Sequence, residues 1–121
     1  MYNEIFSRFI QEVSQDNDCL ELLEDFIEAC SNYVGSVNDL EAALLSARYR
    51  MEAEEYRRYI ADLDNNRSRA HNALIANVKI VNRLCSVNNL DPIIKCNMNN
   101  RVEVAEEAIK VVDDLFKNRR V

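Results

Sequence analysis

Apolar side chains recur along the chain at alternating steps of three and four residues. The first series is Phe6, Phe9, Val13, Leu20, Leu23, Ile27, Cys30 and Val34. This spacing places the side chains on one face of an α-helix, so the pattern predicts a helix over residues 3–34. Asp16 interrupts the series at a position where the spacing requires an apolar residue. A kink or restart near residues 16–18 would accommodate this interruption.

Two more helices are expected in the middle of the chain, with a break between them that no Gly or Pro enforces. An Asn followed three residues later by a Glu is a start signal and predicts a short helix over residues 38–48. The apolar register then slips near residues 49–51. Beyond the slip, one register continues far enough to predict a single helix over residues 51–88. The alternative is a break at residues 64–66, because Asp and Asn are weak helix formers and good caps.

The length of the third helix constrains the shape of the molecule. A helix over residues 51–88 would be about 57 Å long. A compact globule of this chain length is only about 35–40 Å across. The helix must therefore protrude, bend or pack against a partner chain.

A loop over residues 86–99 separates this helix from a last helix at residues 100–118. The loop is indicated by Asp91-Pro92, because the residue before a proline disfavours helix, and Asn99 or Asn100 can cap the helix that follows. The last helix has a wide apolar face, which predicts that its neighbours surround it. With one Gly, one Pro and no strand-like alternation, the chain is expected to be all-α and a single domain over residues 1–121. The expected architecture is an elongated up-down bundle of four main helices, at about 3–34, 38–48, 51–88 and 100–118.

The net charge of −6 is distributed unevenly along the chain. Residues 1–47 carry ten acids and one base, residues 48–101 carry ten bases and six acids, and residues 102–121 carry five acids and four bases. The simplest interpretation is that the acidic first part packs beside the basic middle part. Separate acidic and basic binding faces are the alternative. An acidic protein with a pI near 4.8 is a poor candidate for nonspecific nucleic-acid binding.

Targeting signals and cysteine chemistry suggest a cytoplasmic protein. The N-terminal residues MYNEIFSRFIQEV lack the basic and apolar regions of a signal peptide. Apolar runs are about four residues long, whereas a membrane span needs roughly 20. The cysteines form no C-x-x-C pair, and Cys19, Cys30 and Cys85 fall in or beside apolar stripes. We therefore expect these cysteines to be buried as small apolar residues. The short apolar runs predict that the protein does not associate with a membrane.

Few residues carry recognisable chemistry. His71 is the single histidine, and neither a second histidine nor a glutamate stands at metal-ligand spacing, so no metal and no cofactor are expected. Ser68 lies three residues before His71, but no glycine-rich turn accompanies it. One glycine cannot build a phosphate-binding loop, and no small-molecule ligand is evident.

One enzymatic interpretation comes from the pair Arg67 and His71. An Arg followed closely by a His on a bundle helix resembles the metal-free ribonucleases of the HEPN superfamily. That resemblance implies an all-helical, usually dimeric enzyme in which the Arg and the His act together. In that family four to six residues intervene between the Arg and the His, whereas here three residues intervene. The alternative function is therefore a HEPN-like ribonuclease that uses Arg67 and His71.

A structural role for Arg67 is the competing hypothesis. Arg67 occupies an apolar position of the third helix, as Asp16 does in the first. If the two helices pack antiparallel with residue 34 near residue 51, Asp16 and Arg67 fall within one turn of each other. A buried Asp–Arg layer would then set the register of the two helices, and His71 would lie half-buried on its flank.

Tyr49, Tyr56 and Tyr59 form a dense aromatic patch beside two arginines. Tyr49 and Tyr56 lie on the core stripe, whereas Tyr59 does not and is the better candidate for a surface contact.

The stretch RMEAEEYRRYIADLDNNRSRAHNALIANVKIVNRLC, residues 50–85, resembles a small family of bacterial helical proteins of unknown function. The resemblance implies a bacterial, cytoplasmic, all-helical protein, and it transfers no site residue. The preferred function is a non-enzymatic helical interaction or scaffold module that acts as a homodimer, with Arg67, His71, Asp16 and Tyr59 as candidate binding residues. An unidentified protein partner, or an adaptor role in a nucleic-acid machine, is a further alternative.

Overall fold

The computed structural model describes the backbone of residues 17–119 and the side chains of residues 20–114. This part of the chain is helical and contains no strand. It comprises α2 (Asn17–Ser46), the short 3₁₀ helix η1 (Ala47–Tyr49), α3 (Ala53–Val87) and α4 (Arg101–Arg119). The predicted all-α class is therefore confirmed.

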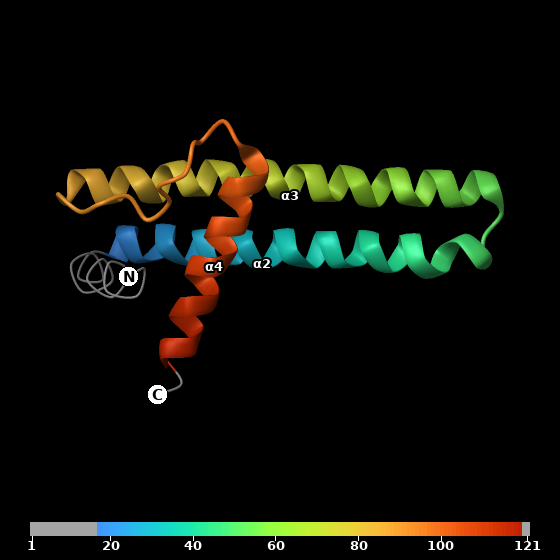
Figure 1. The fold of residues 1–121 in the computed structure, drawn as a ribbon, viewed down its shortest axis with the longest axis horizontal. Helices are drawn as coiled ribbons and strands as arrows, with labels where there is room; N and C mark the ends of the chain where they lie inside the picture. The colour runs from blue at the N-terminus through green and yellow to red at the C-terminus, as the bar shows by residue number, and fades with distance from the viewer. Residues whose placement is uncertain (1–16, 120–121) are drawn as a thin grey trace.

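The two long helices form an antiparallel hairpin, and α4 crosses it (Figure 1). The chain reverses direction through η1 and the residues up to Glu52, which precedes α3. α4 lies across both helices in the half of the hairpin away from this turn, and its first residue lies beside the middle of α3. The molecule is consequently elongated, and α3 protrudes from its body, which is one of the three outcomes that the length of the predicted helix left open.

The prediction of a separate helix over residues 38–48 is wrong. α2 continues without interruption through Gly35 and Ser36 to Ser46, so residues 17–119 contain three α-helices where four were expected. The polar group of Ser36 is satisfied within the helix, because its hydroxyl donates to the carbonyl oxygen of Tyr33 at 2.7 Å. One helical glycine costs only about 1 kcal/mol, which the packing of α2 on α3 exceeds. Residues 3–16 of the first predicted helix lie outside the described residues.

The long third helix is confirmed as one continuous element of 35 residues. No break occurs at residues 64–66. Asp64 accepts a hydrogen bond from the Nε of Arg67 at 2.9 Å instead of capping a new helix. The apolar stripe on either side of this pair continues to face α2, so breaking the helix would forfeit packing at both ends. The predicted interruption near residues 49–51 is also confirmed, as η1 and the turn after it.

The loop between α3 and α4 is fixed at both ends and in its middle. At the end of α3, the N–H of Leu90 donates to the carbonyl of Cys85, and Asn89 adopts a positive φ of 58°. This is a Schellman motif with Asn in the left-handed position. In the middle, the side chain of Asn82 donates to the carbonyl oxygen of Ile94 at 3.1 Å and accepts from its N–H at 3.2 Å.

At the start of α4, Asn100 is the N-cap, as one of the two predicted candidates. Its side-chain oxygen accepts from the N–H of Glu103, and its amide group donates to the Glu103 carboxylate. Two polar groups of the first turn are thereby satisfied.

The hydrophobic core gathers where α4 crosses the hairpin. It includes Phe26 of α2, Leu74 and Val78 of α3, Ile93 of the loop and Val104 of α4, each no more than 1% exposed. The expectation that α4 is surrounded on most sides is wrong, because Val102 of its wide apolar face is 60% exposed. α4 lies over one side of the hairpin and does not enter between its helices.

Candidate functional site

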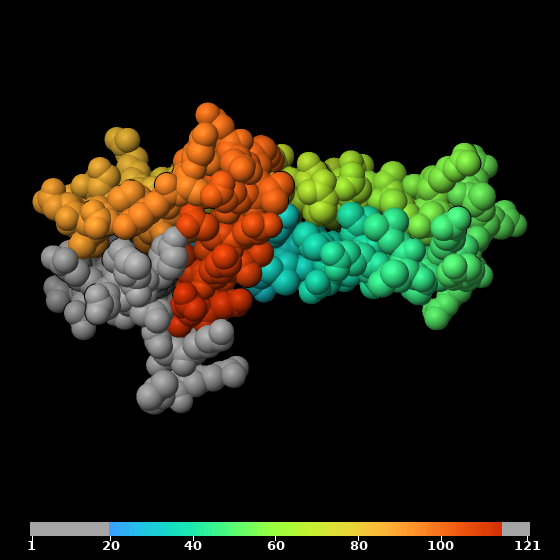
Figure 2. All heavy atoms as spheres, in the orientation of Figure 1, coloured from blue at the N-terminus to red at the C-terminus, as the bar shows by residue number. Residues whose placement is uncertain are grey.

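The half of the hairpin beyond α4 is a two-helix arm, which we define as residues 35–69. It projects from the body of the molecule as a rod (Figure 2). Ala43 is its single buried residue, although the arm includes the last three turns of α2 and the first 17 residues of α3. The remaining apolar side chains of the seam between the two helices are half-buried. Two helices alone cannot enclose a core, because each of them has only one neighbour to cover its apolar stripe.

Large apolar side chains are exposed on the arm. Leu45 is 79% exposed and Tyr49 is 85% exposed, while Leu44 and Tyr59 are 48% and 41% exposed. The exposure of Tyr59 agrees with the sequence analysis, which placed it off the core stripe. The placement of Tyr49 on the core stripe is wrong, because Tyr49 falls in η1, where the helical register ends.

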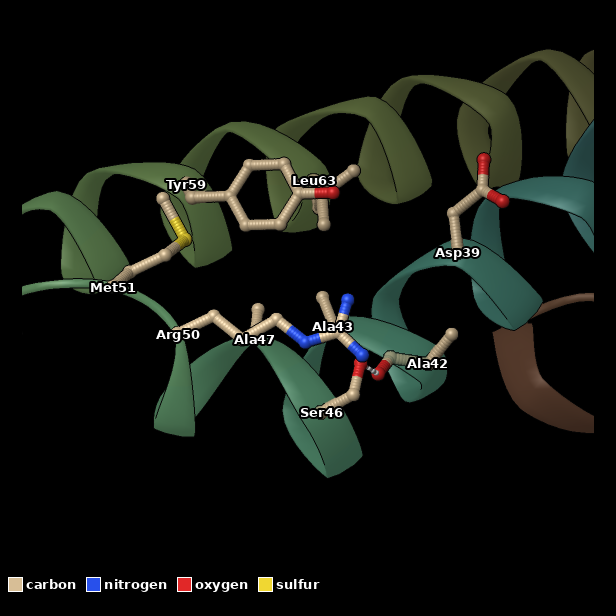
Figure 3. Close-up of a pocket in the computed structure, with 9 residues that line it drawn as sticks. All are labelled: Asp39, Ala42, Ala43, Ser46, Ala47, Arg50, Met51, Tyr59 and Leu63. Atoms are coloured by element: carbon tan, nitrogen blue, oxygen red, sulfur yellow. Dashed lines mark hydrogen bonds between the residues drawn. The ribbon is translucent and has the colours of Figure 1, made fainter.

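A groove of about 590 Å³ runs along one side of the arm between α2 and α3 (Figure 3). Its floor on α2 consists of small side chains, and its wall on α3 includes Tyr59 and Leu63. Asp39 lies at one end of the groove and Arg50 enters from the other end. The full lining is Asp39, Ala42, Ala43, Ser46, Ala47, Arg50, Met51, Tyr59 and Leu63.

Arg67 and His71 lie one turn apart on α3, but their polar groups have different surroundings. The Arg67 side chain is 30% exposed and pairs with Asp64 of its own helix. His71 is 6% exposed and is covered by α2 and α4. The two residues are thus close in the fold, but they contact different groups: Arg67 pairs with Asp64, and His71 contacts α2 and α4.

His71 occupies the junction of the three helices. Its ring lies 4.9 Å from the ring of Tyr33 on α2, and its Nε2 lies 2.9 Å from the carbonyl oxygen of Arg101 on α4. Because a carbonyl oxygen only accepts, Nε2 is the protonated nitrogen in this contact. The Arg101 guanidinium also donates to the side-chain oxygen of Asn72. His71 therefore joins the first turn of α4 to the middle of α3, a closer packing than the half-buried flank predicted for it.

The predicted Asp16–Arg67 layer depends on Asp16, which lies outside the described residues. The register assumed for it is wrong, because the hairpin turns after Ser46 rather than near residue 34. In the observed register Tyr33 faces His71, so Arg67 lies beside residues near 34–37 of α2. Residues 34–37 lie roughly 26 Å along α2 from the first turn of that helix, which begins at Asn17.

The cysteines among the described side chains are free thiols. Burial raises the pKa of Cys30 to about 12, with a further contribution from the charge of Asp113, and burial raises the pKa of Cys85 to about 11. Their burial was predicted and is confirmed, whereas the side chain of Cys19 lies outside the described set. Cys96 is half-buried, and its pKa is raised to about 11 by desolvation and by its hydrogen bond to Glu107. Thiols with these pKa values are protonated and weakly nucleophilic near neutral pH.

The described part of the chain contains neither a metal site nor a membrane-spanning helix. No three His, Cys, Asp or Glu side chains of that part are grouped as a metal site requires. No helix within it combines the length and the hydropathy that a membrane span requires.

These features define an all-α protein made of a long helical hairpin, a crossing third helix and a projecting arm. The chain belongs to the family described as "Protein of unknown function (DUF3232)", whose match covers residues 2–121. The resemblance of residues 50–85 to a small uncharacterised helical family is thereby confirmed, and its bacterial origin stays a prediction. No curated protein matches the chain, and no solved structure does.

Proposed function

We propose that the protein is a non-enzymatic helical interaction module that associates with a second copy of itself through the arm. The observation that carries this proposal is the near absence of buried side chains in the arm, where Ala43 alone is buried among the described residues 35–69. An antiparallel pair of helices with a half-buried apolar seam is half of a four-helix bundle. Two arms side by side would supply the second layer that each arm lacks.

The exposed aromatic side chains support the same assignment. Tyr49 and Tyr59 both lie at the arm, and tyrosine is enriched at interface anchors because it buries a large apolar area and keeps one polar group. Tyr59 was singled out from the sequence for this role. A cytoplasmic location and an additional protein partner belong to the same proposal.

Sedimentation equilibrium of paired variants tests the role of the arm. Replacing Tyr59 by Glu is expected to weaken self-association by at least tenfold, because a charge would be desolvated at the interface. Val87→Glu is the matched control, since Val87 is 71% exposed at the end of α3, outside the arm. Equal weakening of self-association by both changes would contradict the proposal. Unchanged self-association in both variants would contradict it as well.

The ribonuclease alternative stays a prediction that rests on Arg67 and His71. An RNA-cleavage assay addresses it directly, with His71→Asn as the variant that keeps a polar side chain at this buried site. Cleavage by the wild type that this variant loses while it remains folded would favour the enzyme over the interaction module.

A further inference from the structure

The floor of the groove on the arm is a single face of α2 and its extension. The six residues Asp39, Ala42, Ala43, Ser46, Ala47 and Arg50 are spaced by three, one, three, one and three positions. This spacing places them on one helical stripe. The four central residues are Ala or Ser, and Ala42 and Ser46 among them are exposed, so a second helix can approach this side of the stripe closely.

The two ends of the stripe carry opposite charges that have no partner within the described chain. Neither the Asp39 carboxylate nor the Arg50 guanidinium forms an ion pair or a side-chain hydrogen bond with a residue that the structure describes, and both residues are exposed. They are eleven positions apart, which corresponds to about 16 Å along a helix. Figure 3 shows Asp39 and Arg50 coming from opposite ends of the groove. Each charge is therefore available to a group that comes from another molecule.

We propose that the groove binds the same groove of a second copy, with the two α2 helices antiparallel about a two-fold axis midway between residues 39 and 50. Asp39 of each copy then lies opposite the partner's Arg50, so that two identical ion pairs form. The same axis places Ala42 opposite the partner's Ala47 and Ala43 opposite the partner's Ser46. This inference rests on the proposed homodimer and specifies its interface.

The order of charges along the stripe favours a second copy over an unrelated partner. An isologous two-fold interface requires a surface that is complementary to itself. A stripe of one sign would repel its own copy, whereas acid at one end and base at the other attract it in the antiparallel orientation. Charges arranged in this way set orientation and register more than they add affinity. The small residues supply the close contact, and Tyr59 at the groove wall covers it.

Charge reversal at the two ends, followed by mixing, tests the geometry. Asp39→Arg alone and Arg50→Glu alone each create two repulsive contacts per dimer, and each is expected to raise the Kd of self-association at least tenfold. An equimolar mixture of the two variants is expected to form a heterodimer with an affinity near that of the wild type. In that mixture each arginine faces an acid, which no intramolecular effect can reproduce. The recovery also shows that both variants are folded.

Three control variants distinguish the effect of a change in the groove from the effect of a change in the net charge of the arm. Glu41→Arg and Arg48→Glu change the net charge by the same amounts on side chains outside the groove, and they are expected to change the Kd less than twofold. Leu45→Glu reports on the opposite face of α2 and is expected to leave the dimer intact.

The outcomes distinguish this geometry from dimerisation itself. A wild-type dimer that tolerates both groove reversals, or a mixture that fails to recover, would overturn the two-fold pairing and leave the homodimer standing. Disruption by Leu45→Glu in place of the groove variants would assign the interface to the opposite face and would also overturn it. A wild-type monomer would overturn both proposals.

Discussion

The Nε2 atom of His71 lies 2.9 Å from the carbonyl oxygen of Arg101, and this contact fastens the first turn of α4 to the middle of α3. The other side of the imidazole packs against Tyr33, so one residue contacts all three helices of the described chain. The part of the molecule that contains the hydrophobic core meets the arm at this point, because His71 is the first buried residue of α3. The single histidine of the chain is thus a structural junction.

Replacing His71 by Ala is expected to lower the free energy of unfolding by about 2–4 kcal/mol. The change leaves a cavity beside Tyr33 and removes the donor to the Arg101 carbonyl. Urea denaturation followed by circular dichroism measures the difference. Arg69→Ala is the control on the same helix, because Arg69 is exposed, and it is expected to change stability by less than about 0.5 kcal/mol. Equal midpoints for the two variants would show that His71 does not anchor α4.

Gly35→Ala is expected to stabilise the protein by roughly 0.5–1 kcal/mol. Gly35 lies in the interior of α2, and a Cβ added there would meet nothing within 4 Å. The gain comes from helix propensity, since alanine loses less backbone entropy than glycine. Ala61→Gly, at an exposed position inside α3, is the reciprocal change and is expected to cost about the same amount. A lower thermal midpoint for Gly35→Ala would argue against an uninterrupted α2.

The effect of replacing Asn89 on stability is expected to depend on the backbone conformations that the new residue allows, and not on the loss of a polar side chain. It holds a φ of 58° in the Schellman motif that ends α3. Gly tolerates this conformation, so Asn89→Gly is expected to be neutral or stabilising by a few tenths of a kcal/mol. Asn89→Val is expected to cost about 1–2 kcal/mol, because a β-branched residue is strained there. Thermal unfolding of the two variants measures the difference. Equal thermal midpoints for Asn89→Val and Asn89→Gly would contradict this prediction.

Stability is expected to fall as the pH rises above about 9. The pKa values of Cys30 and Cys85 are about 12 and about 11 in the fold, against 9.0 for an unperturbed thiol. The folded state therefore holds these protons more tightly than the unfolded chain does. The resulting stability is complete below pH 9 and is lost as the pH rises toward the folded values, by up to about 1.4 kcal/mol per pH unit for each thiol.

Urea denaturation between about pH 8 and about pH 10.5 measures this slope. Cys30→Ala and Cys85→Ala are expected to flatten it, whatever their effect at neutral pH. An unchanged slope in both variants would mean that the thiols ionise in the folded state at their ordinary pKa.

Much of the fold could be predicted because helical periodicity records which face of a helix is buried. The register of α3 survives Arg67, and the structure keeps one helix there, since packing on both sides outweighs a single polar side chain. The same periodicity failed at residues 34–38, where Gly35 and a start signal favoured a break. Local signals of about 1 kcal/mol were opposed there by contacts with α3 that lie far away in the sequence.

The groove could not be predicted from periodicity alone. Its stripe consists of small residues and two charges, a composition that resembles an ordinary solvent-facing surface. The pairing of residue 43 with residues near 59 also depends on where the hairpin turns, and the sequence analysis placed that turn twelve positions too early. The signal that was present is the spacing of Asp39 and Arg50 at the two ends of a helical stripe of Ala and Ser.

The central claim is that the arm is completed by a second copy of the chain. Light scattering coupled to size exclusion measures the molar mass of the unmodified protein directly, over concentrations from about 1 μM to several hundred μM. A chain of 14.0 kDa that pairs through the arm is expected to rise to twice this mass and stop there, because a two-fold interface closes. A mass that stays at 14.0 kDa throughout this range would contradict the account.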